Sequence, residues 1–178
     1  MAAVSATRTV APLRYLPVTP LPQQALAHGA PPLWWVGCHG GAGVSTLHRL
    51  TGLGVELGAR WPAVHQSWST QQIVLVTRAT AAGMLAATGA VDQVRGRQVP
   101  GVHVLGLVVV AGSPHRPPKV VTDRIALLTG WVSRVWRVGW CRELLAVDDP
   151  RDVGMPPDVD AVRAGLGRLL AAGEVIAR

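Results

Sequence analysis

The residues of this chain whose types and spacing best fit a chemical task form one glycine-rich run, HGGAGVST, at positions 39–46. An apolar segment precedes the run, and hydroxyl residues follow it at the start of a predicted helix. In the pattern G-x-x-x-x-G-K-[ST], backbone N–H groups surround bound phosphates, the Lys neutralises them and the hydroxyl holds Mg²⁺. Here Cys38 occupies the first glycine position and Val44 the lysine position. The sequence therefore predicts a phosphate cradle that lacks its usual positive charge.

Each residue of this loop has more than one interpretation. The loop either contacts phosphate through its amides and the helix dipole, or is only a tight turn from strand to helix. His39 either replaces a lysine as a weaker cation or is a solvent-exposed loop residue. For Cys38 we expect a small buried residue rather than a thiolate stabilised by the helix N-terminus. Ser45 is expected to cap the helix, and it holds a metal only if a nucleotide binds.

The elements that would position this loop are apolar strands alternating with helices. We expect strands at 33–37, 73–77, 102–111 and 132–138, and helices at 45–59, 79–94, 118–128 and from 157 onward. The second and third strands carry apolar residues at both odd and even positions rather than in alternation, which is typical of strands buried on both faces. This order predicts an α/β fold, with a parallel sheet flanked by helices.

The chain divides into an N-terminal arm and one domain. Residues 1–32 are rich in proline and show no helical or strand period, so we expect a flexible arm followed by an α/β domain at 33–178. The longest apolar run, 104–111, is too short to span a membrane, and no secretion signal is evident. The cysteines Cys38 and Cys141 are expected to be free thiols. We therefore expect a soluble, cytoplasmic protein.

The net charge of +7 is concentrated in residues 95–142, which carry eight basic residues and one acidic residue. This basic centre either faces an acidic partner, phosphate or nucleic acid, or merely follows from arginine-rich codon usage. Nucleic acid is the less favoured partner because no recognised nucleic-acid module accompanies the charge. The segment 115–119 either binds an anion at the sheet edge or is a solvated loop. If the first interpretation holds, one face for an anionic ligand is formed by Arg116, Lys119, Arg134 and Arg137.

Two further groups of residues have a structural and a functional interpretation. The seven tryptophans are expected mainly in the core, although Trp131, Trp136 and Trp140 would also suit a partner surface. The acidic end of the segment 144–150 fits a helix end and a solvated turn better than a metal site.

The run from His39 to Leu47 resembles the deviant phosphate loop of the ParA/MinD family, K-G-G-x-G-K-[ST]-T-x. Residues 73–77 resemble that family's strand after the switch region, 106–110 its "GLVxN" strand, and 135–140 its "vxxVPW" segment. The resemblance covers roughly residues 33–145, by pattern rather than by identity. The chain also resembles an actinobacterial family of small P-loop-like proteins, a likeness that implies no particular function.

Carried over by position, the resemblance implies a nucleotide-binding set made of Cys38, His39, Gly40, Gly41, Ala42, Gly43, Val44, Ser45 and Thr46. In that family the first Lys reaches across a nucleotide-sandwich dimer and the second touches phosphate; His39 and Val44 stand at these positions. Ser45 stands at the hydroxyl that holds Mg²⁺, so the implied cofactor is ATP, or another nucleotide, with Mg²⁺. Hydrolysing members also end a strand with Asp, whereas here the strands run into 77–78 and 112–113 without a carboxylate.

These observations lead to three hypotheses for a reduced P-loop NTPase-like domain of ParA/MinD type. The first is nucleotide binding with little or no hydrolysis, in a regulatory or assembly component. The second is a nucleotide-free adaptor whose fold is only a scaffold within a larger assembly. The third is an ATPase completed by residues of a partner. All three imply a protein partner or a homodimer.

Overall fold

A five-stranded parallel sheet forms the centre of the molecule. The computed structural model describes residues 12–20, 33–64 and 70–176. The sheet has the order β3-β2-β5-β6-β7, and every neighbouring pair is parallel. Its strands are β2 (Trp34–Gly37), β3 (Val55–Gly58), β5 (Gln71–Arg78), β6 (Val102–Val110) and β7 (Val135–Val138). The predicted α/β class with a parallel sheet and flanking helices is confirmed.

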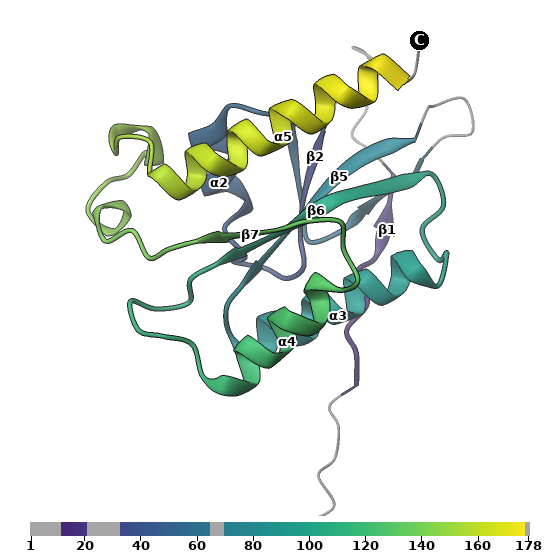
Figure 1. Cartoon of the computed structure of the whole chain (residues 1–178), viewed down its shortest axis with the longest axis horizontal. Helices are drawn as coiled ribbons and strands as arrows, with labels where there is room; N and C mark the ends of the chain where they lie inside the picture. The colour runs from purple at the N-terminus through teal and green to yellow at the C-terminus, as the bar shows by residue number, and fades with distance from the viewer. Residues whose placement is uncertain (1–11, 21–32, 65–69, 177–178) are drawn as a thin grey trace, which may run out of the picture.

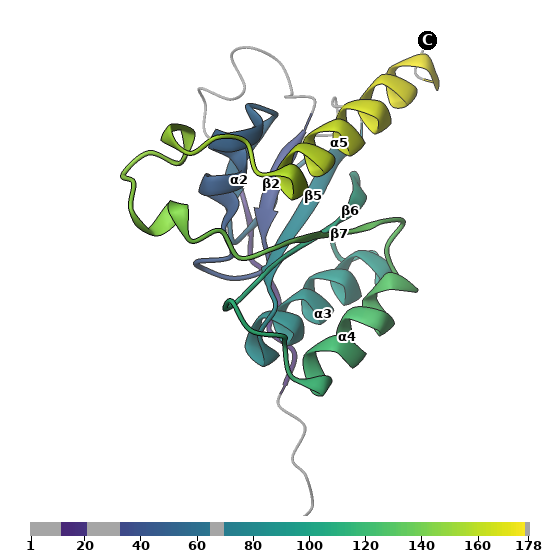
Figure 2. The same ribbon diagram turned by 60° about the vertical axis from the view of Figure 1, so that its left-hand side comes forward.

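Helices cover both faces of this sheet. One face carries α2 (Val44–Thr51) and α5 (Pro157–Ile176), and the other carries α3 (Ala81–Arg95) and α4 (Lys119–Thr129). Figure 1 shows α2 and α5 above the sheet with α3 and α4 below it, and the turned view in Figure 2 shows the same two layers. None of the helices in the described ranges is long and apolar enough to cross a membrane.

The middle of each central strand is apolar on both faces because helices cover both sides of the sheet. Along β5, Ile73 and Leu75 belong to the core cluster under α3 and α4, whereas Val74 and Val76 belong to the cluster under α2 and α5. Alternate side chains of a strand point to opposite faces, so continuous apolarity serves two cores at once. All four side chains are fully buried. The sequence-based expectation for β5 and β6 is therefore confirmed.

The first helix is shorter than expected. The spacing of leucines predicts a helix over 45–59, but α2 ends at Thr51 and β3 follows as an edge strand. Gly52 and Gly54 both adopt positive φ, 66° and 64°. A Cβ on Gly54 would lie 2.5 Å from the Leu33 carbonyl oxygen. The prediction for the second half of this helix is wrong because these glycines turn the chain back beside β2.

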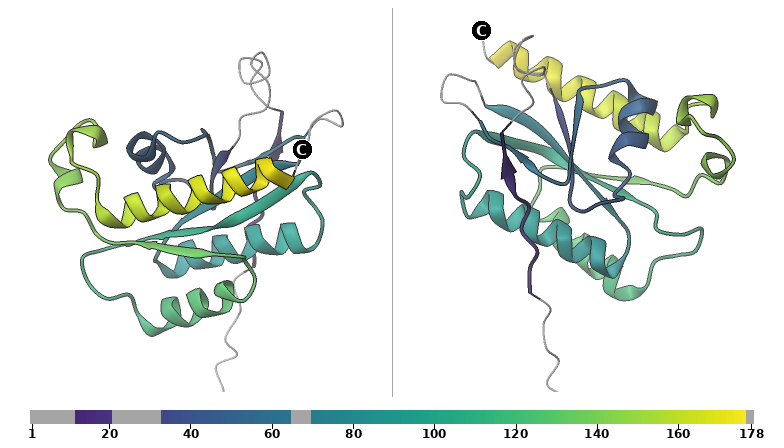
Figure 3. Two further views of the ribbon diagram at one scale, coloured as in Figure 1. Left: turned by 45° about the horizontal axis from the view of Figure 1, so that its top comes forward. Right: turned by 180° about the vertical axis from the view of Figure 1, so that it is seen from behind.

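Part of the N-terminal segment packs on the domain, in contrast to the flexible arm expected for 1–32. Within the described residues 12–20, Leu16 is buried, and β1 (Val18–Thr19) pairs in parallel with β4 (Trp61–Pro62). Figure 3 shows this segment crossing α3, and the Arg14 backbone lies against Gly89 of that helix. The structural reason is hydrogen bonding rather than apolar periodicity, because the buried side chain of Gln93 on α3 binds both backbone groups of Leu16. Residues 1–11 and 21–32 lie outside the described residues.

The later helices follow their sequence signals closely. Thr80 caps α3 by accepting a hydrogen bond from the Gly83 N–H, and α4 begins directly after two prolines. The last helix, α5, begins at Pro157 as predicted and directs Val159, Val162 and Leu166 into the core. Prolines at or just before the first helical position explain both starts. An N–H at that position would have no intrahelical partner, so nothing is lost when proline lacks it.

Candidate functional site

The glycine loop lies where the connections of the sheet change direction. From β2 the chain passes through α2 to the edge strand β3, then returns to the other side of β2 as β5 and continues outward. The helices after β2 and β5 therefore lie on opposite faces of the sheet. In open α/β sheets, ligands bind outside the carboxyl ends of the strands at such a switch point.

The backbone of the loop leaves several amide groups available. Gly41 and Gly43 have φ of 73° and 103°, and a Cβ added at Gly40 or Gly41 would meet nothing within 4 Å. The backbone N–H groups of Gly40, Gly41 and Gly43 donate no hydrogen bond to any of the residues that the structure describes. Gly43 is the N-cap of α2, and no side chain caps this helix. The loop thus presents uncompensated donors at a helix N-terminus, where negative charge is stabilised.

Ser45 does not take the capping position that the sequence suggested. Ser45 does not cap α2; it is the second residue of the helix, and its side chain is exposed. The cap prediction is wrong because the chain enters the helix through Gly43 in the left-handed region. Thr46 is half-buried and lines a cavity beside the loop.

Two residues of the loop turn inward. Val44 is 8% exposed and Ala42 is 2% exposed, and both belong to the core cluster under α2 and α5. The Val44 Cγ2 atom lies 3.1 Å from the position that a Cβ on Gly37 would take. The side chain at the lysine position therefore closes the base of the loop and carries no charge.

His39 joins the glycine loop to the end of β5. Its Nε2 accepts a hydrogen bond from the Arg78 backbone N–H at 3.2 Å, and its Nδ1 lies 2.8 Å from the Gly40 carbonyl oxygen. Together these contacts assign the neutral ring with its proton on Nδ1, because a carbonyl only accepts. A Cβ on Gly83 would lie 3.1 Å from Nε2, so the ring sits between the loop and the first turn of α3.

A positive charge reaches the loop from the neighbouring strand. Arg78, the last residue of β5, donates from Nε to the Gly41 carbonyl oxygen at 3.1 Å. The side chain is half-buried and lines the cavity that begins at the loop. Arg78 is not among the site residues predicted from the sequence. The sequence does show a basic residue at the end of a buried strand. Only the pairing of β5 with β2, however, brings that residue beside the glycine loop.

The cavity extends from the loop toward α5 and has a volume of about 660 Å³. One end is formed by Gly43, Thr46 and Arg78, and the other by the β7–α5 connection, which stands at the left of Figure 1. Its apolar wall consists of Leu47, Leu50, Val110, Val138, Trp140, Leu144, Leu145, Val153, Met155 and Val159. Sites for drug-sized ligands and cofactors commonly measure about 300–1,000 Å³ and are mainly apolar with a few polar groups. The cavity therefore matches a ligand with one polar end and an apolar body.

The residues around the loop do not fit a magnesium site. Magnesium binds through carboxylates and phosphates, but β5 ends in Thr77 and Arg78 and β6 ends in Val110. Asp158 lines the cavity and accepts a hydrogen bond from the Gly139 N–H at 3.1 Å. Among the residues in the described ranges, no group of three or more His, Cys, Asp or Glu side chains could hold a metal ion.

The acidic segment after β7 forms turns, as the sequence analysis favoured. It contains two short 3-10 helices, Glu143–Leu145 and Pro150–Asp152. Asp149 accepts from the Arg151 side chain and backbone, and this pairing holds the pKa of the Asp149 carboxyl well below its usual range. Asp149 is therefore engaged in an ion pair and a cap.

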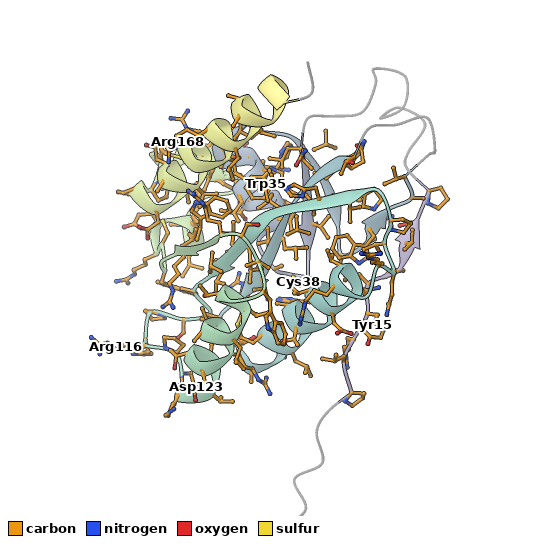
Figure 4. The ribbon with its side chains drawn as sticks, turned by 45° about the vertical axis from the view of Figure 1, so that its right-hand side comes forward. Tyr15, Trp35, Cys38, Arg116, Asp123 and Arg168 are labelled. Carbon is orange, nitrogen blue, oxygen red and sulfur yellow. The ribbon has the colours of Figure 1, made fainter. Side chains whose placement is uncertain are left out.

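The two cysteines differ in environment. Figure 4 shows Cys38 inside the molecule on the α3 side of the sheet, with Trp35 on the α5 side. Burial raises the pKa of the Cys38 thiol to about 12, so Cys38 is a core residue, as expected. Cys141 is half-buried, lines the cavity, and its Sγ lies 3.2 Å from Glu143 Oε2. Both thiols are free.

The basic residues of the centre lie in different local surroundings. His115 and Arg137 line a second cavity of about 390 Å³ at the carboxyl end of β6, near Arg116. Lys119 pairs with Asp123 at 2.8 Å, and Figure 4 shows Arg116 and Asp123 projecting from the α4 end. Arg134 directly precedes β7 and lies at the amino end of that strand, whereas Arg137 lies near its carboxyl end.

The tryptophans divide between the core and separate surface positions. Trp34, Trp35 and Trp61 are fully buried. Trp131, 41% exposed, lies before β7 and has the Arg95 guanidinium 4.8 Å from its ring centroid; Trp140, 37% exposed, follows β7. These two rings lie beyond opposite ends of β7, and Trp136 within the strand is half-buried, with the Arg134 guanidinium 5.9 Å from its ring centroid. Trp68 lies outside the described residues.

Comparison of the chain with protein-family models, with curated proteins and with solved structures finds no match. Fold and site thus define a doubly wound parallel α/β protein with a glycine-rich loop at its switch point.

Proposed function

We propose that this protein is a nucleotide-binding, P-loop-like component that turns its nucleotide over slowly or not at all and acts as a regulatory or assembly element. The observation that carries the proposal is the continuity of the cavity from the loop to the β7–α5 connection. It joins Gly43 and Arg78 at one end to the Trp140 ring at the other. Phosphate would lie at the loop and the base against the apolar wall.

The chemistry of the loop supports binding of an anion. Amide donors at a helix N-terminus stabilise phosphate even without a lysine. The Arg78 guanidinium is anchored through Nε to the Gly41 carbonyl, and its terminal nitrogens form no hydrogen bond with any of the residues that the structure describes. A planar guanidinium presents paired donors that match phosphate geometry. Arg78 thus takes over the electrostatic task of the lysine that Val44 replaces.

The same residues argue against efficient hydrolysis. Phosphoryl transfer relies on cations that neutralise developing charge and on a residue that orients the attacking water. The strand ends beside the loop carry no carboxylate for a metal or for that water. We expect no ATPase or GTPase activity above background.

Calorimetric titration of the full-length protein with adenine and guanine nucleotides tests this function. We expect saturable binding of at least one nucleotide, together with an increase in the thermal midpoint, because a ligand that binds only the folded state stabilises it. Failure of every adenine and guanine nucleotide to bind would refute the proposal. Steady turnover on the order of 1 s⁻¹ that copurifies with the protein would refute the absence of hydrolysis.

The second candidate is a nucleotide-free adaptor, and one observation favours it. On α4 and its C-terminal end, Leu127 is 60% exposed and Trp131 is 41% exposed, with Arg95 stacked on Trp131. Aromatic and arginine side chains are enriched in protein interfaces. This surface lies away from the glycine loop, so a protein that binds no nucleotide could still use it.

A further inference from the structure

The cavity beside the glycine loop has an unusual charge balance for a nucleotide site. Among the described residues that line it, Arg78 is the only basic one, and Glu143 and Asp158 are acidic. Both acids belong to the β7–α5 side, which faces the loop across the cavity. Each phosphate added to a ligand must therefore be accommodated by one arginine and the amide donors, in a cavity whose opposite side carries two carboxylates.

The carboxylates are fixed in place by local contacts. Asp158 accepts the Gly139 N–H at 3.1 Å, and the Glu143 carboxylate lies 3.2 Å from the Cys141 thiol. Hydrogen bonds from its own backbone N–H and from Cys141 lower the pKa of Glu143, so it is ionised near neutral pH. Repulsion between like charges grows with the number of phosphates, and it is only partly screened in a concave site.

A divalent cation would ordinarily remove this repulsion, but the residues beside the loop do not supply one with ligands. The lysine position is apolar and buried, Ser45 is exposed, and the strands beside the loop end without carboxylates. A ligand of low charge needs no such cation, because one arginine and the loop amides suffice for one phosphate.

We propose, on the basis of the proposed function, that the cavity selects a nucleoside monophosphate and binds it without a divalent metal. The phosphate contacts the Arg78 guanidinium and the amides of the glycine loop. The base packs against the Trp140 ring and the apolar wall. Glu143 and Asp158 disfavour a second and a third phosphate.

The first test is a calorimetric comparison of AMP, ADP and ATP, and of the guanine series, each with Mg²⁺ and with EDTA. We expect the monophosphate to bind most tightly, the triphosphate to bind at least about tenfold more weakly, and EDTA to change the monophosphate Kd by less than about twofold. Tightest binding of a triphosphate that requires Mg²⁺ would overturn this inference and leave the proposed function intact. Absence of binding by all six nucleotides would overturn both.

The second test isolates the phosphate contact. Arg78→Ala should weaken AMP binding by about tenfold or more, because charge-assisted hydrogen bonds to phosphate are lost. Arg124→Ala is the matched control: Arg124 also donates to a backbone carbonyl, that of Ala81 at 2.8 Å, but it lines neither cavity. Adenosine, which lacks phosphate, should bind both variants and the unaltered protein equally.

Two outcomes of this second test would contradict the assignment of Arg78. One is an equal loss of AMP affinity in both arginine variants, and the other is a parallel loss of adenosine affinity in Arg78→Ala. Thermal melts of each variant separate these results from unfolding, and Arg78→Lys retains the charge if Arg78→Ala does not fold.

The third test concerns selectivity. Glu143→Gln keeps the shape of the side chain and removes its charge, so ATP affinity should rise by about threefold or more relative to AMP. Glu56→Gln on β3, away from the cavity lining, is the control and should leave the ratio unchanged. An unchanged ratio in Glu143→Gln would show that this carboxylate does not govern the number of phosphates.

Discussion

Gln93 is a buried side chain whose hydrogen bonds hold the N-terminal segment on α3. Its Oε1 accepts from the Leu16 N–H at 2.8 Å and from the Trp61 Nε1–H at 3.0 Å, and its Nε2 donates to the Leu16 carbonyl at 2.9 Å. Buried polar groups are strongly destabilising when they lose their partners. One amide therefore satisfies three groups that belong to two other segments.

Gln93→Leu should lower the free energy of unfolding by about 2–4 kcal/mol, because the Leu16 and Trp61 groups lose their buried partners. Chemical denaturation measures this loss. Gln98→Leu on the exposed surface after α3 is the matched control and should change stability by less than about 0.5 kcal/mol. Equal effects of the two changes would show that the hydrogen bonds of Gln93 contribute little.

The cysteines provide a second prediction at the residue scale. In the folded protein, a thiol reagent at neutral pH should modify Cys141 and not Cys38, because only thiolates react and burial keeps the Cys38 thiol protonated. In denaturant both cysteines should react. Since burial raises the pKa of Cys38 from the ordinary thiol value of 9.0 to about 12, the free energy of unfolding should fall as pH rises from about 9 toward 12.

Modification of Cys141 also reports on the cavity it lines. A bound nucleotide that fills the cavity should slow the reaction of Cys141, whereas Cys38 should stay unreactive throughout. Peptide mapping by mass spectrometry distinguishes the two positions. Modification of Cys38 at the rate of Cys141 in the folded state would contradict the burial of Cys38.

At the scale of elements, α3 supports both the site and the N-terminal segment. Its first turn lies against His39, and a Cβ on Gly83 would come within 3.1 Å of that ring. One and a half turns later, Gly89 lies directly under the backbone of Arg14. The glycines that weaken α3 as a helix are the positions where other segments approach it closely.

Gly89→Ala should destabilise the protein by about 1–3 kcal/mol, although alanine favours helices, because the new methyl group would collide with the Arg14 backbone. Gly167→Ala in α5 is the matched control, since a Cβ there meets nothing within 4 Å. The control should stabilise the protein by about 0.5–1 kcal/mol. A stabilising Gly89→Ala would indicate that residues 12–20 do not pack on α3 in solution.

At the scale of the whole molecule, the sheet separates two cores that share its central strands. The N-terminal segment joins the core under α3 and α4 through Leu16, and the glycine loop joins the other core through Val44. Loss of the N-terminal segment should therefore destabilise the core under α3 and α4 and leave the conformation of the glycine loop intact, because the two belong to different layers.

Removing residues 1–20 should lower the thermal midpoint by about 5 °C or more, since Leu16 is 7% exposed and its packing on α3 is lost. Leu16→Ala in the full chain should reproduce much of this shift. Calorimetric melts measure both. An unchanged midpoint after truncation would contradict this packing and support the flexible arm that the sequence suggests.

Local patterns were sufficient for the fold class and for several elements. The continuous apolarity of β5 and β6 predicts strands buried on both faces, and the prolines before α4 and α5 mark where those helices begin. The glycine run likewise predicts the turn from β2 into α2. Such signals depend on neighbours within a few residues, so a single sequence contains them in full.

Only the tertiary structure determined the composition of the site and the end of the first helix. Arg78 reaches Gly41 across 37 positions of the chain, and Leu16 meets Gln93 across 77. The edge strand β3 also depends on pairing with β2, which helical periodicity over 45–59 conceals. Strand order decides which side chains meet at the carboxyl edge, and that order results from the packing of whole elements rather than from any local propensity. The glycine loop was therefore legible in the sequence, whereas the arginine beside it became apparent only when β5 lay next to β2.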